Sequence, residues 1–296
     1  MSKKNISIYM NCHAHEIIRH LTMSNEFNSQ YNLPDHIVSF RIINRGHFIE
    51  EELNKLKECN VFIYNPVSNK QGKFSCTEVL KLVNPDAIKI CIPYYRFRGY
   101  WFNKAPTESV HNDFFDQAID MAIINQLKTK FTIENHREMT KEYLSSLFKK
   151  TYEDTDKELH EHVRKSLDEI RNFDSESTVH MYDFVEKNWR EKQLFHNYCH
   201  PTAVFFRELV QRMFKYLGLT RKIEIRKTHM GLDSHQFPLF PCITEGLKLP
   251  FGKQHVNIIK HSINIWEFVK IYYYYNYFEE YKQKKLVDLI EILKIT

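Results

Sequence analysis

The fold is decided near the N-terminus by the stretch Ile6-Ser7-Ile8-Tyr9-Met10-Asn11-Cys12-His13-Ala14-His15-Glu16. Its first five residues form a mainly apolar run that predicts a strand. Apolar residues at helical spacing follow at Ile17, Ile18 and Leu21, and they predict a helix. The stretch is therefore a strand, a tight turn and a helix start, with Cys12 at the turn. Backbone N–H groups and the positive end of a helix lower the pKa of a cysteine, so we expect Cys12 to act as a nucleophile near neutral pH.

Short strands and amphipathic helices alternate over about the first hundred residues. Apolar runs predict strands at residues 6–10, 36–42, 61–64 and 87–92, and helical spacing predicts helices at 15–23, 48–58 and 75–83. This alternation is typical of an α/β fold with a mostly parallel sheet that helices cover on both faces. A ligand site is then expected at the carboxyl ends of the strands. Three turns fall there: Asn11-Cys12-His13, Tyr64-Asn65-Pro66 and Pro93-Tyr94-Tyr95-Arg96.

Beyond residue 106 the pattern is largely helical. Helices are predicted at 113–127, 140–152, 156–172, 179–190, 202–217 and within 265–293. Neither an internal repeat nor a low-complexity linker separates the parts of the chain. We therefore expect an α/β core at residues 1–105 that carries a strand-end active site. A helical elaboration at residues 106–296 is expected to return residues 194–218 to this site, so that the two parts form one integrated domain.

The composition is that of an ordinary globular protein. The chain has 296 residues, of which 43% are hydrophobic and 27% are charged. It contains no run of eighteen apolar residues, and its N-terminal Met-Ser-Lys-Lys-Asn leads into a segment too short and polar for a signal peptide. These features predict a cytoplasmic protein without an integral membrane segment.

Charge and cysteine content narrow the classes of ligand. The formal net charge of +5 is spread along the chain, which suits a small anionic ligand and gives no reason to expect nucleic acid. Six cysteines lie at irregular distances without a CxxC pair. This spacing favours reduced thiols over a disulfide framework or a zinc site.

A second polar segment, Asn197-Tyr198-Cys199-His200-Pro201-Thr202, precedes an amphipathic helix. The apolar stripe of that helix consists of Phe205, Phe206, Leu209, Val210, Met213 and Leu217. Pro201 suits a first helical turn, which would place His200 at or just outside the helix N-terminus. An imidazole on this edge can accept a proton from a thiol or a hydroxyl. It can equally cap the helix or bond a loop carbonyl.

Three motifs together resemble the WcbI family of polysaccharide-biosynthesis acetyltransferases. They are the strand that ends in Asn11-Cys12-His13, the segment at residues 92–100, and Asn197-Tyr198-Cys199-His200-Pro201-Thr202 before a helix. The resemblance covers roughly the first hundred residues and a later block to about Gly218. It implies a core like that of the SGNH (GDSL-like) hydrolases, coenzyme A as a ligand, and acetylation of a sugar in a capsular or other surface polysaccharide.

The resemblance also implies roles for individual residues. Cys12 would stand where the hydrolases keep their serine, and His200 would supply the imidazole. Asn197 would replace the carboxylate that orients this imidazole, because an asparagine carbonyl can still accept its N–H. Cys12 would either attack the thioester of acetyl-coenzyme A or orient it while His200 deprotonates a sugar hydroxyl. The backbone N–H groups of the Cys12 turn and the Asn65 side chain are candidate donors to the oxyanion.

Coenzyme A carries phosphates and an adenine, so its site needs cations beside planar surfaces. The loop after the strand at residues 87–92 supplies both with Tyr94, Tyr95, Arg96 and Arg98, and we expect these residues to bind the cofactor together with His13. The same aromatic loop could instead clamp the helical region onto the sheet.

Other functions remain open at this stage. An esterase-like SGNH hydrolase could use the same Cys12 and His200 pair, since transfer and hydrolysis differ in water exclusion and acceptor binding. The His13-x-His15 pair after a strand is also compatible with a metal-dependent hydrolase, whereas the main hypothesis needs no metal. A noncatalytic module that stacks ligands on its aromatic residues is a third possibility. The saccharide acceptor and a homo-oligomeric state are not encoded by any motif.

Overall fold

The structure is a computed structural model that describes residues 2–103, 118–132, 135, 138–220, 236–252, 255–258, 261–278 and 288–289. Residue contacts divide the chain into two compact units. The first comprises Met1–Arg96, Asp168–Lys187 and Cys199–Leu232, and the second comprises Phe97–Leu167, Asn188–Tyr198 and Asp233–Thr296. The N-terminal segment of the first unit therefore ends at Arg96. The division into a core at residues 1–105 and a helical elaboration remains a prediction.

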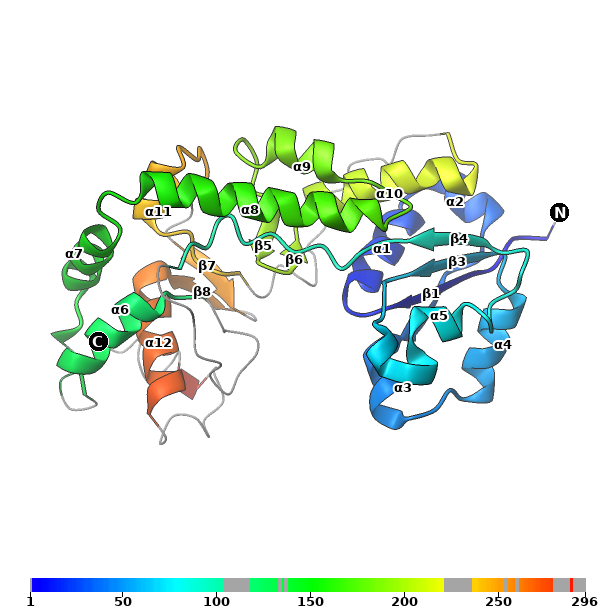
Figure 1. Cartoon of the computed structure of the whole chain (residues 1–296), viewed down its shortest axis with the longest axis horizontal. Coiled ribbons are helices and arrows are strands. Elements are labelled where there is room, and N and C mark those ends of the chain that lie inside the picture. Colours follow the sequence, from blue (N-terminus) through cyan, green and yellow to red (C-terminus); the bar gives the residue numbers. More distant parts are fainter. Residues whose placement is uncertain are drawn as a thin grey trace. The chain divides into compact units, whose positions relative to one another are not determined.

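A four-stranded parallel sheet forms the centre of the first unit (Figure 1). Its strands are β1 (Ile6–Met10), β2 (Asp35–Val38), β3 (Val61–Tyr64) and β4 (Ile88–Cys91), in the order β2-β1-β3-β4. The predicted α/β class and parallel sheet are confirmed. Because the chain adds β2 on one side of β1 and then β3 on the other, the strand order reverses at β1 and β3. The crevice at the carboxyl ends of these two strands is where such sheets bind ligands.

Helices of the first unit surround this sheet. They are α1 (His13–Thr22), α2 (Asn25–Gln30), α3 (Ser39–Arg45), α4 (Glu50–Glu58), the 3-10 helix η1 (Asn69–Phe74), α5 (Cys76–Val79), α9 (Tyr182–Asn188) and α10 (Ala203–Leu217). Tyr9 and Phe62 from the sheet share a buried core with Ile42 of α3, Leu56 of α4 and Val79 of α5. Helix α1 contacts β1 and packs against α10.

The strand predicted at residues 36–42 is too long. It ends at Val38, and Ser39 begins α3, which stops at Gly46 in a left-handed conformation (φ +81°). The reason is the register of β2 against β1, in which Val38 pairs with Met10, the last residue of β1. Residues after Val38 have no strand beside them, so their backbone groups are satisfied within a helix instead.

The second unit holds the later helices and a hairpin. Its elements are α6 (Met121–Lys130), α7 (Lys141–Thr151), β5 (Phe195–Asn197), α11 (Pro241–Gly246), β7 (His255–Ile258), β8 (His261–Asn264) and α12 (Ile265–Tyr277). Helix α8 (Asp156–Ser175) contributes its residues up to Leu167, and the rest of α8 belongs to the first unit. The antiparallel pair β7 and β8 was not predicted. Residues 113–117 of the predicted helix at 113–127 lie outside the described residues.

The tyrosine run near the C-terminus is part of the core of the second unit. Tyr273 and Tyr274 are buried in α12 and donate their hydroxyls to the backbone oxygens of Phe131 and Thr132 at 3.0 and 3.1 Å. None of the helices among the described residues is long and apolar enough to span a membrane.

Candidate active site

Cys12 lies at the junction of β1 and α1, as the sequence predicts. It is the residue before the first turn of α1 and is half-buried. Its sulfur lies 3.7 Å from the hydroxyl oxygen of Tyr94, which follows β4. The thiol therefore lies at the carboxyl-end edge of the sheet, where ligands bind in this class of fold.

The expected lowering of the Cys12 pKa is wrong. Burial raises the pKa of the Cys12 thiol above its ordinary value. The Tyr94 hydroxyl and the backbone N–H groups of Cys12 and His13 lower the pKa, but their effect is smaller than that of burial. The same turn that directs N–H groups at the sulfur also removes it from water. The resting thiol is therefore protonated at neutral pH and needs a base before it can attack a carbonyl.

His13 joins the start of α1 to the segment that precedes α10. Its Nε2 atom lies 2.8 Å from the carbonyl oxygen of Cys199. Burial lowers the pKa of His13 to about 4, so the ring is neutral at physiological pH and its Nε2–H donates to this carbonyl. Tyr94 stacks on the imidazole at a centroid distance of 4.2 Å, and Phe206 of α10 meets it edge-on at 5.5 Å.

Tyr94 is the centre of the site. Its ring lies between two groups, since it stacks on His13 and the Arg96 guanidinium carbon lies 5.4 Å from its centroid. Burial raises the pKa of Tyr94 far above its ordinary value, and the neighbouring Cys199 and Cys12 thiols raise it further. The phenol therefore keeps its proton and is a hydrogen-bond donor next to the Cys12 sulfur.

His200 is buried in β6 (His200–Pro201), and α10 begins three residues later at Ala203. The prediction that Pro201 lies in the first helical turn is wrong, because Thr202 is the residue that caps α10. Cys199 directly precedes His200 in the chain, and its carbonyl oxygen accepts the hydrogen bond from His13. The backbone before α10 is thus brought to the residue next to Cys12, despite a separation of 186 positions between His13 and Cys199.

Asn65 follows β3, beside the end of β1. It is buried, and its side-chain N–H donates to the carbonyl oxygen of Ile92 at 2.5 Å. One of its two amide hydrogens is therefore committed to the backbone. The Oδ1 atoms of Asn65 and Asn11 are buried and have no hydrogen-bond partner among the residues that the structure describes. Both strand ends thus carry an amide oxygen that can accept a hydrogen bond from a ligand.

Of the other predicted site residues, Tyr95 belongs to the first unit, whereas Arg98 and Asn197 belong to the second. Tyr95 is buried, and its hydroxyl donates to the Asp174 carboxylate and the Val179 carbonyl, both at 2.8 Å, so it has a structural role in the core. Asn197 is buried in β5 and Arg98 follows Phe97, and both belong to the second unit. There the Arg98 guanidinium carbon lies 5.9 Å from the centroid of the Tyr198 ring.

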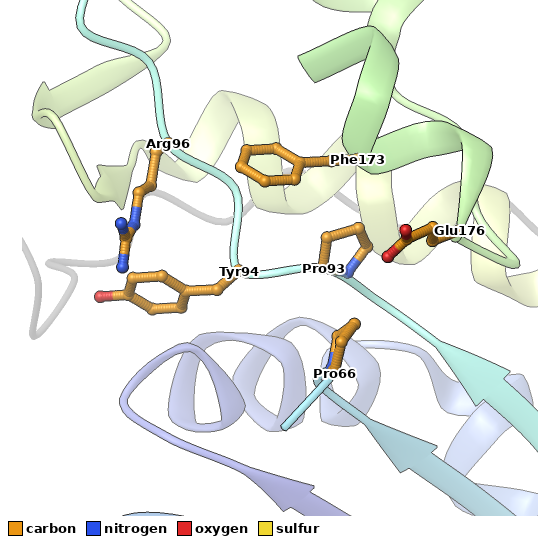
Figure 2. A pocket seen from close by; sticks show the side chains of 6 residues that line it. All are labelled: Pro66, Pro93, Tyr94, Arg96, Phe173 and Glu176. Atoms are coloured by element: carbon orange, nitrogen blue, oxygen red, sulfur yellow. The ribbon is translucent and has the colours of Figure 1, made fainter. Parts of the chain in front are cut away.

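A cavity of about 290 Å³ adjoins Tyr94. Its lining consists of Pro66, Pro93, Tyr94, Arg96, Phe173 and Glu176, all from the first unit (Figure 2). Phe173 and Glu176 were not among the predicted site residues. The buried Ile170 lies three positions before Phe173, and this spacing could have extended the predicted helix beyond residue 172. No sequence pattern shows that the end of this helix faces the strand ends.

The two histidines of the metal-dependent alternative differ in environment. His13 is buried on its bond to Cys199, whereas His15 is exposed and meets the His36 ring edge-on at 4.7 Å. Within the described part of the chain, no group of three or more His, Cys, Asp or Glu side chains is arranged to hold a metal ion. The geometry therefore offers no support for a metal-dependent hydrolase that uses His13 and His15.

The profile of the family described as polysaccharide biosynthesis enzyme WcbI matches residues 5–222, about three quarters of the chain. The chain belongs to the WcbI family of polysaccharide biosynthesis enzymes. It is therefore an enzyme, and the resemblance seen in the sequence is confirmed. The match spans Cys12, Tyr94 and His200. Kinship of the WcbI family with the SGNH hydrolases stays a prediction.

A solved structure of WcbI has the same fold. Its sequence is 18% identical to that of this chain. The match covers 99% of this chain and 94% of the solved WcbI chain, with a TM-score of 0.72. It is described as a novel polysaccharide biosynthesis enzyme, in the form of the native protein without a disulfide bond between coenzyme A and one of its cysteines. No curated protein matches the chain.

Proposed function

We propose that this member of the WcbI family is a coenzyme-A-dependent O-acetyltransferase that acts on a sugar of a capsular or other surface polysaccharide. The observation that carries the proposal is the Cys12 thiol at the edge of a parallel sheet, 3.7 Å from the Tyr94 hydroxyl that also borders a cavity. The description of the solved WcbI structure supports it further, because it speaks of coenzyme A and a cysteine in one protein.

The residues around Cys12 fit coenzyme A. Its acyl thioester needs an accessible thiol, and Cys12 is half-exposed. Its pantetheine amides need acceptors, and the buried Oδ1 atoms of Asn11 and Asn65 lack partners among the described residues. Its phosphates need a cation, and Arg96 carries one beside the flat ring of Tyr94. Cys12, Asn11, Asn65 and Tyr94 would hold the acyl and pantetheine part of the molecule, and Arg96 would bind its phosphates.

The reaction is transfer of an acetyl group between a thioester and a hydroxyl. Acetyl-coenzyme A supplies the activated acetyl group. In one route the Cys12 sulfur bonds to the acetyl carbon while His200 takes the thiol proton, and the carbon–sulfur bond to coenzyme A breaks. His200 returns the proton to the departing coenzyme A thiolate. His200 then takes the proton of the sugar hydroxyl, whose oxygen bonds to the acetyl carbon while the carbon–sulfur bond to Cys12 breaks, and the Cys12 thiolate regains that proton. In the other route Cys12 orients the thioester while His200 removes the proton of the sugar hydroxyl, whose oxygen bonds directly to the acetyl carbon. The carbon–sulfur bond to coenzyme A then breaks, and His200 gives the proton to the departing thiolate.

Both routes place negative charge on the acetyl oxygen. The Tyr94 hydroxyl is a donor beside the sulfur, and the backbone N–H groups of Cys12 and His13 are also directed at it. Because burial raises the pKa of Cys12, the first route needs His200 as a base rather than a preformed thiolate. In this mechanism Cys12 lies at the acetyl carbon, the Tyr94 hydroxyl donates to the acetyl oxygen, and His200 carries the proton.

The test measures acetyl-coenzyme A binding and thiol release. Acetyl-coenzyme A at millimolar concentration should raise the melting temperature of the wild-type protein, since a ligand of the native state stabilises it. Free coenzyme A should appear with a saccharide acceptor, and Cys12→Ser should slow its release at least about 100-fold. The matched control is Cys242→Ser, another half-buried thiol, which lies in α11 of the second unit. Absence of stabilisation, or full activity of Cys12→Ser, would overturn the proposal.

A further inference from the structure

We propose that the cavity beside Tyr94 is the acceptor subsite and that it takes one uncharged pyranose ring, whose hydroxyls are held by Glu176. The inference rests on the proposed acetyltransferase function and adds the location and chemical class of the acceptor. The cavity has a volume of about 290 Å³ and lies entirely within the first unit.

Tyr94 connects this cavity to the thiol. It lines the cavity, and its hydroxyl lies 3.7 Å from the Cys12 sulfur. A hydroxyl group of a ligand in the cavity that approaches the Tyr94 hydroxyl therefore also approaches an acetyl group at Cys12. This is the arrangement that acyl transfer requires, because the acceptor oxygen must reach the acetyl carbon.

The two ends of this cavity differ in charge. Figure 2 shows Arg96 and Tyr94 toward one end and Glu176 toward the other, with Pro93 between them. The Glu176 carboxylate repels phosphate groups, so the diphosphate of coenzyme A is disfavoured at its end of the cavity. A carboxylate accepts hydrogen bonds from hydroxyl groups, and these bonds are stronger than those between neutral partners. A polyhydroxylated, uncharged ligand matches this end best.

The walls and the size also suit one sugar ring. Phe173 presents a half-buried aromatic ring, and Pro66 and Pro93 add apolar surface. A pyranose has an apolar face of C–H groups that packs on such surfaces, while its edge carries the hydroxyls. The cavity lies at the lower limit of the range of about 300–1,000 Å³ for small-molecule sites. It therefore holds one ring rather than a whole coenzyme A molecule.

The wall formed by the end of α8 is fixed to the sheet. The backbone N–H of Thr178 donates to the Cys91 carbonyl at 2.9 Å, and the Thr178 hydroxyl accepts from the Cys91 N–H at 2.9 Å. The buried Asp174 carboxylate accepts from the Tyr95 hydroxyl and from the N–H groups of Met181 and Tyr182 at 2.6–2.8 Å. Phe173 directly precedes Asp174, and Glu176 lies between Asp174 and Thr178, so the subsite is preorganised before a ligand binds.

The experiment compares Glu176→Gln with wild type. Glu176 is exposed, so the change preserves folding. Glu169→Gln in α8, the helix that ends just before Glu176, is the matched control because Glu169 is exposed and outside the cavity lining. The probes are methyl glucoside, methyl galactoside and methyl mannoside at about 100 mM, measured by saturation-transfer NMR and as acetyl acceptors. Glu176→Gln should raise the KM for the accepted glycoside about tenfold and leave the KM for acetyl-coenzyme A unchanged. Phe173→Leu should also weaken the NMR signal.

Each result has a defined meaning. Binding of none of the three glycosides overturns the inference, as does an unchanged acceptor KM in Glu176→Gln. Preference for methyl glucuronide over the uncharged glycosides also overturns it, because the carboxylate of Glu176 should repel that sugar. These failures leave the acetyltransferase proposal intact if acetyl-coenzyme A still binds and Cys12 is still required. Glycoside binding that Glu176→Gln weakens, without any binding of acetyl-coenzyme A, would confirm a sugar site in the cavity but overturn the proposed function and, with it, the role of that site as an acceptor subsite.

Discussion

The Tyr94 hydroxyl lies 3.7 Å from the Cys12 sulfur, although 82 positions separate the two residues. Cys12 follows β1 and Tyr94 follows β4, and β3 lies between these strands in the sheet. The loop after β4 must therefore return across the end of β3 to reach the thiol. This return brings Arg96 and one wall of the cavity to the carboxyl-end edge.

Tyr94→Phe should slow acetyl transfer about 100-fold while preserving the stacking on His13, because it removes one donor to the developing oxyanion. The measurement is the rate of coenzyme A release under saturating acetyl-coenzyme A. Tyr182→Phe is the control, since the Tyr182 side chain is half-exposed on α9 and does not line the cavity. A Tyr94→Phe enzyme with the wild-type rate would exclude this role.

Alkylation of Cys12 should need a higher pH than alkylation of an ordinary cysteine. Burial raises the pKa of the Cys12 thiol, so the midpoint of its reaction with iodoacetamide should lie above that of an ordinary exposed cysteine. Because the Tyr94 hydroxyl lowers this pKa, the midpoint should move further up in Tyr94→Phe. Mass spectrometry of the peptide that contains Cys12 follows the reaction, and a midpoint at or below that of a free cysteine-containing peptide would contradict the expectation.

His13 should make the protein less stable as the pH falls below about 6.5. Burial lowers its pKa from 6.5 to about 4, so between these values the unfolded chain binds a proton that the folded chain does not. The stabilisation is complete above 6.5, and about 2 kcal/mol of it is lost between pH 7.5 and pH 5.

The measurement for His13 is urea unfolding of wild type and His13→Gln at both pH values. Glutamine keeps an N–H donor for the Cys199 carbonyl but does not titrate. The buried His20 and the half-buried His36 also have lowered pKa values, and they contribute equally to both proteins. An equal loss of stability in the two proteins would refute the role of His13.

Asp174→Asn should reduce the free energy of unfolding by about 3 kcal/mol, since the buried carboxylate accepts three hydrogen bonds. Tyr95→Phe should cost about 1 kcal/mol, and the double variant should cost less than the sum because the two residues share a bond. Chemical denaturation measures all three. Asp168→Asn, on the same helix, is the control and should change stability by no more than about 0.5 kcal/mol.

Local patterns predicted the elements that hold the thiol. Strands β1 and β3 have the predicted bounds, because each is a short apolar run that ends at polar turn residues. The position of Cys12 before α1 followed from the same pattern. The direction of its pKa shift did not, since a sequence shows that a thiol precedes a helix but not how far Tyr94 and other groups bury it.

The positions of Phe173, Glu176 and Tyr94 around the cavity depend on contacts between distant segments, which the sequence does not show. Phe173 and Glu176 reach the cavity because Asp174 and Thr178 bind residues of and after β4, about 80 positions away. Tyr94 and Tyr95 are neighbours of the same type, yet only Tyr94 lines the cavity, while Tyr95 bonds Asp174. Their opposite environments come from the path of the loop after β4, which no spacing rule describes.

The contacts of α1 with α10 and, through His13, with Cys199 have a consequence for biosynthesis on the ribosome. All four strands of the parallel sheet lie within the first 91 residues, so the sheet can assemble while most of the chain is still untranslated. Helix α1 must wait for α10, its packing partner, until the codons for residues 203–217 have been read. During this interval the nascent polypeptide exposes the apolar side of α1 and the sulfur beside it to chaperones and to oxidants.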